Sequence, residues 1–534
     1  MDNQKAVAFE DESTKHRGLL IVGLLVAMLF AALDNTIVGT AMPRIVGELG
    51  GLGVMTWLTT AYMLTSTTVV PVAGKLADMI GRKSVYVTGI IIFLIGSALC
   101  GMANSMTQLI IFRGIQGLGG GVMMPMAMII IGDIFTGAQR AKWQGVFGAI
   151  FGLSSVIGPQ IGGWIVDAAN WRWVFYINMP VGILAAILIS LGLKNRKLEG
   201  PIKIDFAGIF TMIVGVVSLL LALTFGGKDY PWGSWQIVSL FAISAVFLTS
   251  FVIVESKSSE AILPMHLFKN KTFSILNGIG FLMSVGMFGA IMFVPLFMQG
   301  IIGMSPSQSG TMMIPMMVSM MVASIFGGQI VRKIGVKPQI ITGMIIMGLG
   351  FWLLSTMGID TTKLVAMSFM ATLGLGMGLV MPILTLALQE SFPKSELGVV
   401  TSSSQFFRQI GGTFGMTILG AIMNYRSTNL LTEKLVPTLE KLPPEAGALV
   451  QQFEGMIKES PQGVYSMLLS PETLEKIPTS IQNMMIPILK STLVDALHSV
   501  FLVGLIFVIL GAILSFFMKK IKLSDPKKEA KGDN

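Results

Sequence analysis

Residues 117–125 read GLGGGVMMP, and residues 374–382 read GLGMGLVMP, 257 positions further along the chain. A second pair recurs at almost the same spacing, because GKLADMIGRK at 74–83 corresponds to GQIVRKIGVK at 328–337, 254 positions later. Two matches in the same order and at nearly equal offsets indicate a chain built from two related halves.

The sequence around these repeats is unusually apolar. The 534 residues are 53% hydrophobic and only 12% charged, whereas soluble proteins carry roughly 25% charged residues. A membrane helix needs about 20 mainly apolar residues. Fourteen runs meet this need, at 18–42, 54–77, 84–103, 108–132, 143–167, 173–193, 205–225, 236–254, 272–299, 308–331, 338–357, 364–389, 398–424 and 496–518. The sequence predicts an all-α integral membrane protein with fourteen transmembrane helices.

The positions of the runs predict a 6+2+6 organisation. We expect a cytoplasmic tail at 1–17, a six-helix bundle at 18–193, a linker with two extra helices at 194–271, a second six-helix bundle at 272–518 and a basic cytoplasmic tail at 519–534. The second bundle includes an outer loop, 426–495, in which Leu449, Val450, Phe453, Met456 and Ile457 follow helical spacing. This amphipathic stretch could lie on the membrane, cap the exit or act as a spacer.

Lysine and arginine gather in alternate loops and in both tails, which predicts that both termini are cytoplasmic in a bacterial cytoplasmic membrane. The net charge of +9 then reflects topology and gives no support to a nucleic-acid partner. The single cysteine, Cys100, excludes a disulfide framework, and three scattered histidines argue against a metal site. No nucleotide-binding lysine motif and no catalytic constellation is visible, so we expect neither a nucleotide partner nor an enzyme.

Four motifs carry a family resemblance: LDNTIVGTAMP at 33–43, GKLADMIGRK at 74–83, LIIFRGIQGLGGG at 109–121 and GAIFGLSSVIGPQIGG at 148–163. In this order, and with WRWVFYINMP at 171–180, they resemble the major facilitator superfamily, and within it the fourteen-span drug:proton antiporters of the EmrB/QacA type. The resemblance implies two pseudo-symmetric bundles that rock around a central cavity and use the proton gradient, without a cofactor.

The resemblance therefore implies a proton-coupled exporter for multidrug efflux and antibiotic resistance. Its expected cargo is small and amphiphilic, either cationic or neutral, and its other partners are protons and membrane lipids. We expect a monomer. The alternative is a proton-coupled exporter or flippase of an endogenous lipid or lipid-like metabolite.

Asp34 is the first candidate for the coupling site. It lies in an apolar run, where a carboxylate normally faces a cavity or a partner. Arg113 enters the fourth run from the same side at a comparable depth, so the two side chains could meet. We expect Asp34 to carry the coupling proton and Arg113 to tune it; the alternative is a static ion pair that ties the two helices.

The motif at 74–83 predicts a conformational latch at the cytoplasmic edge. The resemblance assigns this latch to Gly74, Asp78, Gly81, Arg82, Lys83 and Asp133. Because Arg332 replaces Asp78 in the second copy, the latch is expected to be strong on one side only. Arg82 and Lys83 could instead serve only to orient the loop.

The fifth run carries the motif that the resemblance associates with antiporters. Its residues are Gly148, Gly152, Gly158, Pro159, Gly162 and Gly163. Spacing by three or four places Gly148, Gly152, Ser155, Pro159 and Gly162 on one narrow helix face, which the resemblance packs against the other half. Ordinary helix packing without an antiport role is the alternative.

The remaining candidates are predicted to line a substrate cavity with Asp34. The chain holds 40 methionines, which are flexible and polarizable and so suit cargo of varied shape. The candidates are Phe30, Phe288, Phe293, Met312, Met316 and Arg408. Most methionines could equally face lipid or packed core, and Arg408 could equally satisfy backbone carbonyls.

Overall fold

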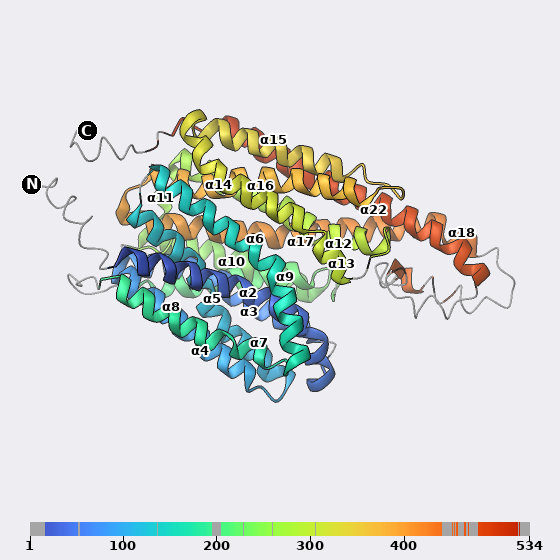
Figure 1. Ribbon diagram of the computed structural model, residues 1–534, viewed down its shortest axis with the longest axis horizontal. Helices are drawn as coiled ribbons and strands as arrows, with labels where there is room; N and C mark the ends of the chain where they lie inside the picture. Colours follow the sequence, from blue (N-terminus) through green and yellow to red (C-terminus); the bar gives the residue numbers. More distant parts are fainter. Residues whose placement is uncertain are drawn as a thin grey trace, which may run out of the picture.

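The computed structural model describes residues 16–51, 54–135, 137–194, 204–227, 229–258, 260–304, 306–439, 479–521 and 523, with short pieces between 451 and 468 (Figure 1). Within these residues the regular structure is helical, and the single bridge between Gly226 and Tyr230 belongs to no strand. The all-α prediction is confirmed for the described part of the chain.

The N-terminal half consists of long helices joined by short turns. They are α2 (Arg17–Leu49), α3 (Trp57–Ile80), α4 (Arg82–Gly101), α5 (Met106–Ile134) and α6 (Gly137–Ala168), followed by α7 (Trp173–Tyr176) and α8 (Asn178–Gly192). Helix α5 packs on α3 and α4, while α2 packs on α6 and α8. Gly81, with φ of 95°, makes the sharp turn between α3 and α4.

Two linker helices and a second set of long helices follow. The linker holds α9 (Phe206–Phe225), α10 (Trp235–Lys257) and the short α11 (Met265–Lys269). The C-terminal half holds α12 (Lys271–Gly300), α13 (Pro306–Thr311), α14 (Ile314–Ile334), α15 (Val336–Leu354), α16 (Lys363–Ser391), η2 (Lys394–Glu396), α17 (Leu397–Lys434), α18 (Val436–Leu439) and α22 (Thr479–Phe516). The predicted domain boundaries agree closely with these elements, but the division into domains stays a prediction.

Twelve helices of the described residues are long and apolar enough to cross a membrane. The other two expected spans, α3 and α17, form helices of 24 and 38 residues, but they carry the polar runs TSTT at 65–68 and TSSSQ at 401–405. These two helices pack against each other, and most residues of both polar runs are buried. The polar runs therefore pack against protein rather than lipid. The count of fourteen spans stays a prediction.

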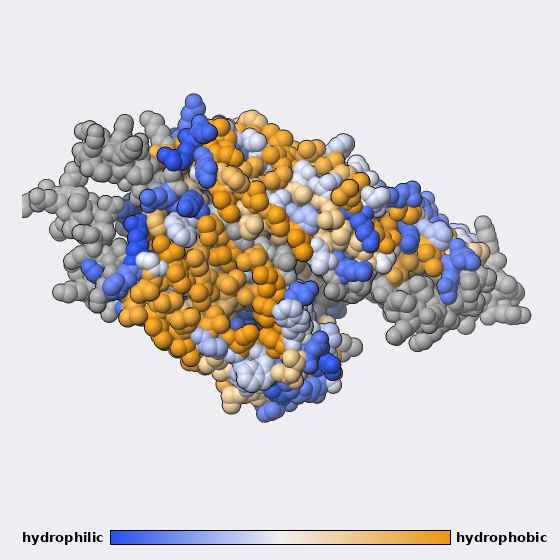
Figure 2. Space-filling model, viewed as in Figure 1, coloured by the Kyte–Doolittle hydropathy of each residue, from blue (hydrophilic) through white to orange (hydrophobic). Residues whose placement is uncertain are grey.

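On the face shown in Figure 2, a broad apolar belt covers the middle of the molecule, and hydrophilic residues gather toward its two ends. Exposed apolar side chains on α8 alone include Ile183, Leu184, Ile187 and Leu191. Such a belt is far larger than the apolar patches of soluble monomers, so it matches a surface in contact with lipid.

The two ends of the molecule are distinct. We call the end at which α2 begins and α22 ends the basic end; Arg17 donates there to the Ile134 carbonyl at 2.9 Å, and Lys337 donates to the Phe516 carbonyl at 2.7 Å. Its other basic residues include Arg82, Lys83, Arg140, Lys142, Arg332 and Lys333. The opposite end is called the far end. The predicted cytoplasmic location of the basic end stays a prediction.

The predicted outer loop 426–495 is wrong in extent. Helix α17 continues to Lys434 and α22 already begins at Thr479. The Lys434 ammonium pairs with the Asp495 carboxylate at 2.8 Å, and Arg426 Nε donates to Ser499 Oγ at 3.0 Å. These two helices support each other beyond the apolar belt, where hydropathy gives no signal for a helix.

The predicted amphipathic stretch lies partly outside the described residues, which exclude Leu449 and Val450. Phe453 and Ile457 are helical and buried in the hydrophobic core of the C-terminal half. Phe453 and Ile457 therefore pack on protein, and the choice between membrane contact, exit cap and spacer stays a prediction.

Helix α9 lies along the seam where α3 meets α17. It packs on both helices. Thr417 on α17 donates to the Leu223 carbonyl of α9 at 3.0 Å, and the rings of Trp57 and Phe225 lie 5.1 Å apart. One extra helix therefore contacts both halves.

Close helix packing in the N-terminal half gives a prediction about stability. A Cβ at Gly119 would lie 2.3 Å from the Phe93 amide nitrogen and 2.5 Å from the Gly89 carbonyl oxygen. Because backbone must move, we expect Gly119→Val to lower the free energy of unfolding by about 3 kcal/mol. Thermal denaturation of detergent-solubilised protein, followed by gel filtration, measures this. Gly39→Val is the matched control, since nothing lies within 4 Å of its Cβ position; equal melting of both variants would contradict the prediction.

Candidate functional site

Asp34 lies at the centre of a buried polar network in the N-terminal half. Its side chain is 0% exposed, and its Oδ2 pairs with Arg113 Nη1 at 2.7 Å. Its Oδ1 accepts from Gln116 Nε2 and from Asn178 Nδ2, each at 2.9 Å. The carboxylate therefore joins α2 to α5 and α8, and the predicted meeting of Asp34 with Arg113 occurs.

Arg113 has further partners besides the carboxylate. Its Nη1 also donates to Gln116 Oε1 at 2.7 Å and its Nε to the Leu58 carbonyl at 3.4 Å. Its guanidinium carbon lies 4.3 Å from the centre of the Tyr62 ring. These contacts hold Arg113 in place whether or not Asp34 is charged, because none of them needs the carboxylate.

Sequence reasoning missed the amides of this network. Gln116 and Asn178 lie inside apolar runs, and Ser97 completes the set by accepting from both amides at 3.3 and 2.9 Å. The sequence signal that could have identified these two amides is that each is a polar side chain inside an apolar span. Helix α2 continues past Pro43 to Leu49, so at 1.5 Å per residue Asp34 lies roughly 22 Å from that helix end.

A second cluster joins the two halves at the basic end. Arg82 pairs with Asp78 at 2.6 Å and with Asp133 at 2.9 Å. Asp78 also accepts from the amides of Gly398 and Val399 at 3.1 and 2.9 Å. Unpaired amides at a helix start carry partial positive charge. The Asp78 carboxylate therefore caps α17 of the other half.

Three other residues of this motif support the cap to different degrees. Gly74 permits the approach, because a Cβ there would lie 2.0 Å from Ser402 Oγ and 2.6 Å from the Gly398 carbonyl. Gly81 supplies the turn described above, and Lys83 is half-buried at the start of α4.

A second contact between the two halves lies at the same end of the molecule. It is an ion pair, and sequence reasoning missed it. Arg140 Nη1 pairs with Glu390 at 2.7 Å, and both side chains are at least 96% buried. Next to them Gln389 accepts from Gln144 at 3.3 Å and donates to the Met128 carbonyl at 3.0 Å. Glu390 lies 257 positions after Asp133. The repeat offset was thus a signal for it, although Arg332, the counterpart of Asp78, is exposed.

The antiporter motif on α6 contacts two different helices rather than one. Cβ positions at Gly148 and Gly152 would meet Ser324 and Met320 of α14, in the other half. In contrast, those at Gly158 and Gly162 would meet Thr36 and Thr40 of α2, in the same half. Nothing lies within 4 Å of the Gly163 position, and Pro159 sits inside the helix between the two groups.

The apolar cavity candidates lie in packed surroundings. Phe30 packs edge-on against Phe93 at 5.4 Å, and Phe293 and Met316 belong to the core of the C-terminal half, as does Met312 at its edge. Phe288 lies against Gly412. Their role in binding cargo stays a prediction.

Arg408 is buried on α17 with two neutral partners. Its Nη1 donates to Thr385 Oγ1 at 3.2 Å, and its Nη2 donates to Gln405 Oε1.

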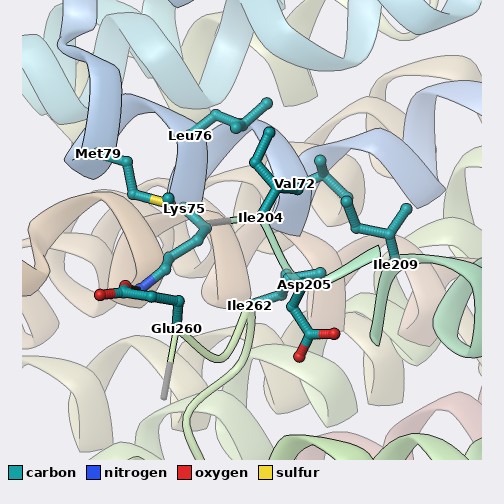
Figure 3. A pocket seen from close by; sticks show the side chains of 9 residues that line it. All are labelled: Val72, Lys75, Leu76, Met79, Ile204, Asp205, Ile209, Glu260 and Ile262. Atoms are coloured by element: carbon teal, nitrogen blue, oxygen red, sulfur yellow. Dashed lines mark hydrogen bonds and ion pairs between the residues drawn. The ribbon is translucent and has the colours of Figure 1, made fainter. Parts of the chain in front are cut away.

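Two of the hollows in the described part of the chain lie at opposite ends of the molecule. The larger, about 530 Å³, opens at the far end between α2 and α6 and is lined by residues such as Arg44, Glu48 and Asp167. The smaller, of about 10 Å³, lies at the basic end beside the Lys75–Glu260 ion pair of 2.8 Å (Figure 3). Only the larger has the size of a ligand site. No cluster suited to a metal ion occurs among the described residues.

Comparison with known proteins identifies the family. The family model described as the Major Facilitator Superfamily matches residues 24–416. The multidrug transporter protein MdtP of Bacillus subtilis (strain 168) is 68% identical over 96% of this chain and 95% of its own. Multidrug resistance protein 3 of the same organism is 38% identical over 96% and 98%.

Solved structures show the same fold at low identity. The human organic anion transporter MFSD10 matches with a TM-score of 0.59 at 11% identity, covering 92% of this chain and 99% of its own. The proton:xylose symporter XylE matches with a TM-score of 0.58 at 12% identity, covering 95% and 98%. The chain belongs to the Major Facilitator Superfamily and is a multi-pass membrane transporter, not an enzyme.

Proposed function

We propose that this transporter exports amphiphilic drugs or other toxic compounds in exchange for protons, by alternating access. The observation that carries the proposal is the buried Asp34–Arg113 pair with its amide partners. The names of the two Bacillus relatives support the choice of drugs as cargo. We assign the basic end to the cytoplasm, in keeping with the preference for positive loops on that side.

The Asp34 network suits a group that gains and loses a proton. A proton on Asp34 removes the ion pair of 2.7 Å. Arg113 then keeps Gln116, the Leu58 carbonyl and the Tyr62 ring, so its charge is not left without partners. The network thus has two arrangements that differ by one proton, which proton coupling requires.

The helices of this network lead to the basic end. Arg113 and Asp133 share α5 and lie 20 residues apart, roughly 30 Å along the helix. Thr36 of α2 donates to the Ser154 carbonyl of α6 at 3.3 Å, and α6 begins near Arg140. A change at Asp34 can therefore shift both helices whose ends carry the contacts between the halves.

The arrangement corresponds to a state closed on the cytoplasmic side. Asp78 of α3 caps α17 there, and Arg140 pairs with Glu390, so both contacts join the halves at the basic end. Cargo release to the outside and proton entry from it belong to this state.

Asp34→Asn tests the coupling directly. The amide cannot carry a proton, so we expect pH-gradient-driven uptake of an amphiphilic dye into proteoliposomes to fall to the rate of empty liposomes. Asp360→Asn, a change of the same kind at an exposed position between α15 and α16, should transport like wild type. Gradient-driven uptake at the wild-type rate by Asp34→Asn would refute the proton role. Gradient-dependent movement of a labelled lipid, with no movement of the dye, would favour the lipid alternative.

The contacts at the basic end give a second prediction. Glu390→Gln removes the charge from a buried ion pair, so we expect the closed state to lose about 1–3 kcal/mol. In a cysteine-free background, spin labels at the exposed positions Ser84 and Lys333 should report longer distances between the halves for Glu390→Gln and for Asp78→Asn. The control Asp495→Asn breaks only the exposed pair with Lys434. Distance distributions identical to wild type in both variants would rule out a latch.

A further inference from the structure

Arg408 is a buried cation without an acidic partner among the described residues. Three other buried or partly buried arginines each pair with a carboxylate: Arg113 with Asp34, Arg82 with Asp133 and Arg140 with Glu390. Arg408 is 7% exposed and has only the oxygens of Thr385 and Gln405. Neutral oxygens offset the cost of burying a charge only in part.

The Arg408 guanidinium has N–H donors beyond the two that form these hydrogen bonds. An arginine has five N–H donors in a planar fork, and two are used here. The remaining donors suit a carboxylate, which the fork can bind through two parallel hydrogen bonds. Thr385 and Gln405 hold the side chain in position, which lowers the entropy lost when an anion binds.

Arg408 lies at the boundary between the halves. It is roughly 16 Å along α17 from the basic end, so it sits at membrane depth. Gln405, its hydrogen-bond partner one turn earlier, contacts Met124 Sδ on α5 of the other half at 3.4 Å. Because this contact joins the two halves, rocking of the halves would change it and the surroundings of Arg408.

The aliphatic part of the Arg408 side chain packs against Gly280, which has no side chain of its own. A Cβ at Gly280 of α12 would lie 3.3 Å from Arg408 Cγ and 3.7 Å from Cδ. Leu384 lies beside the same glycine. Apolar neighbours thus lie beside the stem of Arg408, where the hydrocarbon part of an amphiphile could pack.

We propose that Arg408 binds the carboxylate of a transported acidic amphiphile. This inference rests on the proposed export function and narrows its cargo. In the N-terminal half the charge of Arg113 is balanced by Asp34, whereas no carboxylate of the described residues pairs with Arg408. An unbalanced cation at this position favours an anionic cargo, in contrast to the cationic or neutral cargo considered from the sequence.

A matched pair of probes tests the carboxylate alone. Wild-type protein in nanodiscs, in chloride-free buffer, is titrated with a dansyl-labelled fatty acid and with its methyl ester, and the signal of empty nanodiscs is subtracted. We expect the acid to bind roughly 10–100-fold more tightly than the ester, the range for a hydrogen bond to a charged group. Acidification that protonates the probe should remove this preference in wild type, without any substitution.

Variants assign the preference to the residue. Arg408→Gln should bind acid and ester alike while keeping the wild-type affinity for the ester, and Arg408→Lys should keep part of the preference because its charge remains. Arg426→Gln, on the exposed outer part of the same helix, is the control and should behave as wild type. Gel filtration and thermal denaturation establish that each variant is folded.

Three results would overturn the inference: equal binding of acid and ester by wild type, an undiminished preference in Arg408→Gln, or saturation of the site by chloride that displaces the acid. None of them bears on proton-driven dye transport by wild type and Asp34→Asn. Failure of the Arg408 site and failure of the export function are therefore distinguishable.

Discussion

A charge inside a membrane needs a partner, and the arrangement of this protein depends on how each buried charge finds one. Asp34 and Arg113 are buried together between α2 and α5, and two amides take up the second carboxylate oxygen. The pair fixes the relative positions of helices that are otherwise held by apolar packing, which has many similar solutions in lipid. Removing one partner would leave the other as an isolated charge, so the pair constrains the whole N-terminal half.

The same constraint acts differently at the basic end, where the partners come from opposite halves. Asp78 is satisfied by the first amides of α17, and Arg140 by Glu390. Opening the basic end would break both the Asp78 cap and the Arg140–Glu390 ion pair. The two contacts follow the internal repeat only in part. Glu390 corresponds to Asp133, but Asp133 pairs with Arg82 of its own half, whereas Glu390 pairs with Arg140 of the other half. The repeat thus places an acidic residue at the same position in both halves, and its partner differs.

Much of this could be predicted because spans and motifs are local signals. The helices agree with the apolar runs, and Asp34 with Arg113 stood out as charges within them. The sequence could mark Asn178 as a polar residue within a span and Glu390 as a counterpart of Asp133, but it could not pair them with Asp34 and Arg140, because those pairings are set by tertiary contact. The last part of α17, to Lys434, and the first part of α22, from Thr479, were missed for a different reason. They continue as helices supported by each other in a polar region, and hydropathy measures lipid contact rather than helicity.

The division of charges between the halves bears on how transport can be coupled. A ligand shifts a conformational equilibrium only by the difference in its affinity for the two states. Opening the basic end costs the contacts of Asp78 and of Arg140 with Glu390, so a proton or a cargo must bind the open state better by a similar amount. In the proposed mechanism, protonation of Asp34 would act through α5, which carries Asp133 in its last turn, and an anion at Arg408 would act through α17, the helix that Asp78 caps. The two ligands would thus reach the same contact region from opposite halves. Exchange then requires no direct contact between proton and cargo, only that each stabilises the state in which the other is released.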